Sequence, residues 1–154
     1  MTYHPVADHP VADHPMSVLI RVLSAASALE SRVDARLAAV GLSLPKLAAL
    51  RALVTANDTL PLGHLADRLA CVKSNVTQLV ERLEADGFVV RGLDPNDRRS
   101  RLATITEAGR RVYEAGIRIQ REAETDLFGT LSADETEQLA RLLTKIGALG
   151  HRCS

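Results

Sequence analysis

Residues 62–106 read LGHLADRLACVKSNVTQLVERLEADGFVVRGLDPNDRRSRLATIT, and this stretch decides the fold. It predicts a short helix beginning near Pro61, a turn at 70–72, and a second helix over 72–86 that ends at Gly87. Apolar residues recur every three or four positions along that second helix, which indicates one buried face. These residues are Val76, Leu79, Val80 and Leu83.

The opposite face of the second helix is polar and partly cationic. Short hydrogen-bonding side chains and cations suit contacts to base edges and phosphates in a major groove. The sequence therefore predicts a DNA-reading helix. Its candidate contact residues are Lys73, Ser74, Asn75, Thr77, Gln78 and Arg82.

A basic hairpin follows this helix. Residues 88–91 and 102–106 favour strands, and Asp94-Pro-Asn-Asp97 between them favours a turn. Positive charge concentrates here, which indicates a local DNA-contacting feature. Six arginines (91, 98, 99, 101, 110, 111) stand against the acids Asp94, Asp97 and Glu107. Two helices and a basic wing predict a winged helix-turn-helix, a mostly α fold with a small β-hairpin.

Long amphipathic helices flank this unit. An apolar stripe over 17–41 ends at Gly41, and a second helix begins at Ser43. Thr106 can cap a helix after the wing, and Ser132-Ala-Asp-Glu135 is a capping box for the last one. The flanking stripes exceed what a winged helix needs, so we expect 17–41 and 107–150 to form a homodimer interface and 43–106 to bind DNA. The alternative is an intramolecular bundle.

Composition places the chain among ordinary soluble proteins. It has 154 residues, zero formal net charge, 3% aromatic residues and no Trp, which favours a Leu- and Ala-rich helical core. No signal peptide and no stretch of about 20 apolar residues is present, so a cytoplasmic location away from membranes is expected. The sequence offers no phosphate loop, nucleophile elbow or zinc pattern, and hence predicts no enzyme and no cofactor.

The first 16 residues contain the repeat HPVADHPVADHP. Its prolines at five-residue spacing oppose a continuous helix and favour a flexible or extended arm. Its three histidines match no metal-site spacing, although metal binding is the alternative interpretation.

Cys71 allows two interpretations. At the start of the DNA-reading helix, backbone N–H groups and nearby Lys73 would lower the pKa of its thiol and favour a redox role. Alternatively, it is a small buried space-filler.

The segments LADRLACVKSNVTQLVERLEADGFVVR and DPNDRRSRLATITEAG resemble the multiple antibiotic resistance regulators, the MarR family. The resemblance covers nearly all of 17–150 and implies a winged-helix homodimer with its recognition helix at 72–86. It also implies a wing ion pair between Asp97 and Arg99. Arg98 and Arg101 would then contact phosphates or a minor groove, and we expect Arg99 to contact phosphate as well.

Cys71 and Val72 depart from the family's usual Val-Ser, and Asn75 and Gln78 replace frequent Thr and Arg. The base preference predicted from the two amides is an A·T-rich inverted repeat. The resemblance implies a repressor that a small molecule, such as an aromatic acid, releases from its operator. The alternatives are a redox-responsive repressor acting through Cys71, and a winged-helix adaptor that binds protein.

Overall fold

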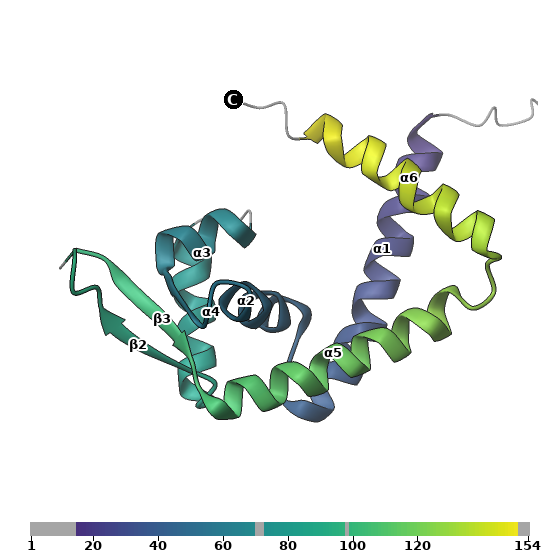
Figure 1. Ribbon diagram of the computed structural model, residues 1–154. Helices are drawn as coiled ribbons and strands as arrows, with labels where there is room; N and C mark the ends of the chain where they lie inside the picture. Colours follow the sequence, from purple (N-terminus) through teal and green to yellow (C-terminus); the bar gives the residue numbers. More distant parts are fainter. Residues whose placement is uncertain (1–14, 70–72, 98, 151–154) are drawn as a thin grey trace, which may run out of the picture.

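Long helices connect a small winged-helix unit to a terminal helix at the other end of the molecule (Figure 1). The structure is a computed structural model and describes residues 15–69, 73–97 and 99–150. Mostly helical architecture with a small antiparallel sheet confirms the predicted fold class. The elements are α1 (Pro15–Leu37), the 3-10 helix η1 (Ala38–Val40), α2 (Leu44–Val54), β1 (Thr59–Pro61), α3 (Leu62–Leu69), α4 (Lys73–Ala85), β2 (Val89–Leu93), β3 (Arg101–Ile105), α5 (Glu107–Phe128) and α6 (Ala133–Gly150).

The sheet has one strand more than the hairpin predicted from sequence. Its order is β1-β3-β2, with both pairings antiparallel. β1 pairs Thr59 with Thr104, and their hydroxyls are hydrogen-bonded at 2.9 Å. Pro61 therefore ends a strand, and the third helix starts one residue later than expected. An edge strand tolerates proline, and three residues are too few to show an alternating pattern.

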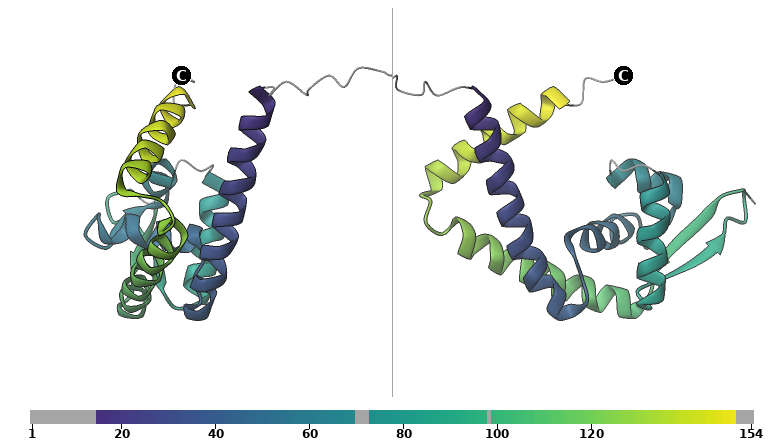
Figure 2. Two further views of the ribbon diagram at one scale, coloured as in Figure 1. Left: turned by 90° about the vertical axis from the view of Figure 1, so that its right-hand side faces the viewer. Right: turned by 180° about the vertical axis from the view of Figure 1, so that it is seen from behind.

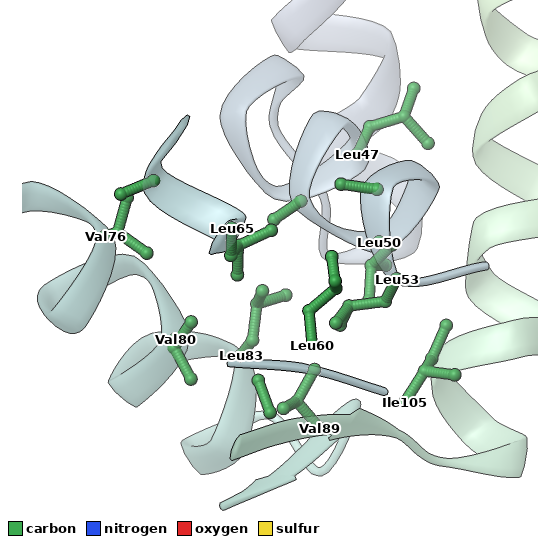
Figure 3. Close-up of a cluster of buried hydrophobic side chains, with 14 of the residues drawn as sticks. Leu47, Leu50, Leu53, Leu60, Leu65, Val76, Val80, Leu83, Val89 and Ile105 are labelled. Atoms are coloured by element: carbon green, nitrogen blue, oxygen red, sulfur yellow. The ribbon is translucent and has the colours of Figure 1, made fainter. Parts of the chain in front are cut away.

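The hydrophobic core lies between α2, the helix-turn-helix and the inner face of the sheet (Figure 3). α2 lies at its centre and contributes leucines that are almost completely buried. The predicted stripe of α4 faces this core, with Val76, Val80 and Leu83 buried and Leu79 partly buried. The largest fully buried side chains are Leu37, Leu47, Leu50, Leu53, Leu65, Leu83, Val76, Val80 and Val89.

Most of the predicted helix ends are confirmed. Gly41 adopts a left-handed φ of 76° after α1 and η1, a conformation that favours glycine. The Thr106 side chain accepts a hydrogen bond from Gly109 N at 3.0 Å, and Ser132 and Glu135 form the reciprocal capping box. Ser43 occupies the N-cap of α2 without a side-chain bond.

The missing cap on α2 comes instead from the preceding helix. Asp34 Oδ1 accepts a hydrogen bond of 2.6 Å from the backbone N–H of Leu44. This contact ties the end of α1 to the start of α2, because a carboxylate satisfies one of the N–H groups left unpaired at a helix start.

The start of α5 is fixed to the base of the wing. Thr106 N donates to Phe88 O at 3.0 Å, and the Thr106 hydroxyl donates to Gly87 O at 2.7 Å. A Cβ at Gly109 would lie 2.1 Å from Phe88 O, so only glycine permits this approach. The long helix α5 and the winged-helix unit are therefore joined without a flexible linker.

The predicted boundary at residue 17 differs slightly from the structure. α1 begins at Pro15, and the repeat-bearing segment 1–14 lies outside the described residues.

Within the described ranges, no single helix is long and apolar enough to cross a membrane. One bent pair, Ser17–Val40 with Leu44–Val54 at 69°, meets that test by length and composition only.

Candidate nucleic-acid interface

α4 presents its polar residues on the side opposite the core. Asn75, Gln78 and Arg82 are exposed and follow one another at helical spacing. Among the described residues, none of the three side chains has a hydrogen-bond or ion-pair partner. Their bonding groups are therefore available to a ligand. Three unpaired polar side chains on one outward stripe fit a surface that reads another molecule.

A second polar stripe on α4 faces the wing. Thr77, Glu81 and Glu84 are spaced by four and three residues, so they share one side of the helix. A pocket of about 460 Å³ lies between this side, the start of α3 and the wing. Its lining residues are Leu62, Thr77, Glu84, Arg91 and Arg101. Thr77 was predicted with Asn75 and Gln78 as one set, but it lies on the wing side of the helix.

The wing turn is held by local hydrogen bonds. Asp94 Oδ1 accepts from Asn96 N at 2.8 Å, and Asp97 Oδ1 accepts from Arg99 N at 2.9 Å. Ser100 N donates to Asp97 O at 2.8 Å and thereby closes the turn. These bonds are typical of aspartate, whose short side chain binds backbone N–H groups two residues ahead.

The wing ion pair implied by the resemblance is therefore absent as a side-chain contact. Asp97 binds the backbone of Arg99, and within the described chain the Arg99 guanidinium has no acidic partner. Because the short Asp97 side chain is already engaged by the backbone, the Arg99 side chain stays exposed on the wing.

The arginine cluster divides into two groups. Arg91, Arg110 and Arg111 are paired with Glu84 and Glu81, with Asp58 and with Glu107, respectively. Arg99 and Arg101 are exposed and unpaired among the described residues. Among the described arginines of this cluster, the unpaired positive charge therefore lies on the outer part of the wing. Arg91 was missed as a site residue because sequence spacing does not identify the acids across from it.

Arg91 is the one described group whose titration is clearly shifted. Its pKa is raised, chiefly by the hydrogen bond to Glu84. Burial opposes this as the next largest effect, and the charge of Glu84 together with the hydrogen bond and charge of Glu81 raise the pKa further. The guanidinium is therefore positively charged at any working pH.

Several predicted residues cannot be placed. Cys71 and Arg98 lie outside the described residues. Lys73 and Ser74 belong to the first turn of α4, but their side chains are also outside the description. In the described part of the chain, no three His, Cys, Asp or Glu side chains gather as a metal site would require.

Comparison with known proteins decides the family. A sequence model described as the MarR family matches residues 40–100. The chain is also 32% identical over 132 residues to the transcriptional activatory protein BadR of Rhodopseudomonas palustris, covering 84% of this chain and 75% of BadR. This chain belongs to the MarR family. It is a winged-helix, DNA-binding protein of transcription regulation.

Solved structures of transcriptional regulators share its fold. The organohalide-sensing regulator RdhR in its 2,4-dichlorophenol-bound form superposes with a TM-score of 0.85 at 18% identity, covering 98% of this chain and 94% of that one. A cysteine-to-serine mutant of MarR from Escherichia coli, complexed with operator DNA, gives 0.75 at 23% identity, covering 86% and 94%. A match of higher identity, 38% over 86 residues, spans 56% of an uncharacterized Bacillus subtilis regulator.

Proposed function

We propose that this MarR-family chain is a homodimeric, sequence-specific regulator, a repressor that a small-molecule effector releases from an inverted-repeat operator. The observation that carries the proposal is the outward stripe of α4, where Asn75, Gln78 and Arg82 are exposed and unpaired beside a wing with Arg99 and Arg101. Amides supply base-edge contacts and arginines supply phosphate contacts, so one surface holds both kinds of recognition. We assign Lys73, Ser74, Thr77 and Arg98 to the same interface.

Homodimerisation is supported by apolar side chains that α1 and α6 leave uncovered. Seen from the side, the two helices stand apart and do not cover each other (Figure 2). The exposed residues are Val18, Leu19, Ile20, Val22 and Leu23 on α1 and Leu142, Leu143 and Ile146 on α6, each between 38% and 61% exposed. Such a surface favours association. A second copy fits best, because a helix-turn-helix gains specificity from two-fold symmetry.

The proposed domain roles follow from this division. Segments 17–41 and 107–150 would hold the dimer, and 43–106 would bind DNA. α5 belongs to both parts, since its first turn is bonded to the wing base while its last turns lie near α1 through the ion pair of Arg36 with Asp126 at 2.8 Å.

An effector site is supported by a pocket of about 290 Å³ between α1, α2 and α5. Its walls are mostly apolar, which suits an aromatic ring. They consist of Leu29, Val33, Leu44, Leu127 and Phe128 with the polar Gln120 and Glu124. The Glu124 carboxylate would repel an anion, so the pocket favours a neutral phenol over the aromatic acid expected from the family resemblance.

A gel shift on the DNA upstream of the chain's own coding sequence tests the proposal. We expect a salt-dependent complex with one inverted repeat, and its dissociation by a neutral phenol at lower concentration than by benzoate. A winged-helix adaptor would give no shift above that of random DNA. In vitro transcription from the shifted promoter separates repression from activation, a necessary step because BadR is named an activatory protein.

A further inference from the structure

A three-residue ion-pair cluster joins the wing to the recognition helix. Arg91 on β2 donates from Nε to Glu84 Oε2 at 2.6 Å and from Nη1 to Glu81 Oε1 at 3.2 Å. The backbone N–H of Arg91 also donates to Glu84 Oε1 at 3.2 Å. Glu84 therefore binds both the backbone and the side chain of Arg91. The planar guanidinium of Arg91 can bind two carboxylates at once.

Among the described residues, few other contacts hold the part of the hairpin beyond Val89 against α4. Of the five residues of β2, only Val89 is buried, and the next four are exposed. β1 supports β3 over Leu102–Thr104 and does not reach the wing turn. A two-stranded ribbon with so little apolar contact is weakly held on its own. Arg91 lies two residues beyond Val89, the one buried residue of β2, and opposite the buried Ala103 of β3, so its ion pairs hold β2 at the outer end of the packed part of the hairpin.

We propose that Arg91, Glu81 and Glu84 form a clamp that sets the angle between the wing and the recognition helix, with Arg91 as a positioning residue for DNA binding. This inference rests on the proposed function, because the angle matters only if both elements contact one duplex. With the clamp closed, Arg99 and Arg101 on the wing reach phosphates while Gln78 lies in the groove. With the clamp open, the recognition helix still binds and the wing contacts are lost.

The clamp makes a prediction opposite in sign to simple electrostatics. Glu81 and Glu84 are acids on a DNA-binding helix, so if they only repelled phosphates, replacing either with glutamine would tighten binding. If they hold the wing, the same replacement weakens binding, even though the protein becomes more positive. The sign of the change therefore separates the two interpretations.

The experiment measures DNA affinity and its salt dependence for Glu84→Gln, with Asp86→Asn as the matched control. The control also converts a carboxylate to an amide and also removes an ion pair between two elements, that of Asp86 with Lys46 on α2, without touching the wing. For Glu84→Gln we expect binding about 2- to 30-fold weaker. The slope of log K against log salt should fall by about one to two units as wing contacts are lost. Asp86→Asn adds the same unit of positive charge and should neither weaken binding nor lower the slope.

Two further variants keep the test decisive. Glu81→Gln removes the negative charge from the weaker of the two side-chain ion pairs, that of Arg91 Nη1 with Glu81 Oε1 at 3.2 Å, and should give a smaller effect of the same sign. The exchange of Glu84→Arg with Arg91→Glu restores an ion pair between helix and strand, and should recover affinity that either single variant loses. Tighter binding by Glu84→Gln at an unchanged slope, or failure of the exchange to recover any affinity, would overturn the clamp.

Hydrogen exchange on the DNA-free protein separates the clamp from the proposed function. The backbone amides of β2 and β3 between Arg91 and the wing turn should exchange faster in Glu84→Gln. The amides of α2 and α5 should exchange at the same rate as in the wild type. Faster exchange in a protein that never binds DNA specifically would refute the proposed function and leave the clamp intact. Unchanged exchange in a protein that does bind DNA would refute the clamp alone.

Discussion

Replacing Gln78 with alanine should change which DNA sequence is bound without weakening the fold. Gln78 is exposed on the side of α4 opposite Val76, Val80 and Leu83. Its amide has no partner among the described residues, so the substitution leaves no buried group unsatisfied. Surface changes of this kind alter the free energy of unfolding by about 0.5 kcal/mol or less. Any larger effect on binding then belongs to the contact with DNA.

The expected magnitude follows from the geometry of a two-fold complex. A bidentate amide contact to adenine N6 and N7 discriminates against the wrong base by roughly 1–3 kcal/mol. At about 1.4 kcal/mol per tenfold, this corresponds to about 5- to 150-fold per half-site. Two copies at equivalent positions would contribute about 2–6 kcal/mol together if the contacts add. Affinity for random DNA should be nearly unchanged, because the phosphate contacts come from arginine and lysine.

Selection of binding sites from a random DNA pool measures this directly. The wild type should enrich an A·T-rich inverted repeat with half-sites roughly 10 base pairs apart centre to centre. Gln78→Ala should lose preference at one position in each half-site. Gln138→Ala is the matched control, since it makes the same change at an exposed position of α6. Identical motifs from the wild type and Gln78→Ala would refute base reading by Gln78, and would leave Asn75 to carry it.

Three further outcomes are expected. Arg99→Ala should weaken binding to all sequences and lower the salt slope by about one unit, as measured by fluorescence anisotropy; an unchanged slope would place the Arg99 side chain off the DNA. Ile146→Asp, at a side chain 56% exposed, should shift sedimentation from twice 16.6 kDa towards 16.6 kDa while the helical signal persists; a dimer of undiminished affinity would contradict the α6 interface. Gly109→Ala should cost at least about 1–3 kcal/mol in chemical denaturation, because its Cβ would overlap Phe88 O at 2.1 Å, whereas Gly63→Ala, with nothing within 4 Å, should cost nothing comparable.

Periodic and local features were predictable from the sequence. The stripe of α4 follows from helical spacing, and the caps at Thr106 and Ser132 involve partners only three residues away. These features depend on interactions between near neighbours in the chain, so the local sequence is enough to predict them. The helix-turn-helix and the wing also followed from local patterns, the family resemblance implied the same arrangement, and comparison with known proteins confirmed the fold.

Contacts between residues distant in sequence were not predictable. Arg110 pairs with Asp58 across 52 positions, and β1 pairs with β3 across 45 positions. Arg91 lies seven positions after Glu84, and because a turn falls between them this spacing does not place the two residues on one face of a helix or strand. A count of charges along the sequence therefore grouped all six arginines as one basic feature, although three of them form ion pairs with acidic side chains.

The described packing also restricts how an effector could act on DNA binding. Val76, Val80 and Leu83 hold α4 rigidly in the same core as α2, and the Phe88–Thr106 contacts fix the start of α5 to that core. The proposed pocket touches none of these residues and lies where α1, the start of α2 and α5 meet. A ligand there can shift an equilibrium only between states that differ at that junction.

We therefore expect the effector to change the separation of the two recognition helices in the dimer and to leave the conformation of each recognition helix unchanged. Binding to a duplex that carries a single half-site should keep its affinity when effector is added, while binding to the full inverted repeat weakens. Equal loss on both duplexes would show that the effector acts within the winged helix.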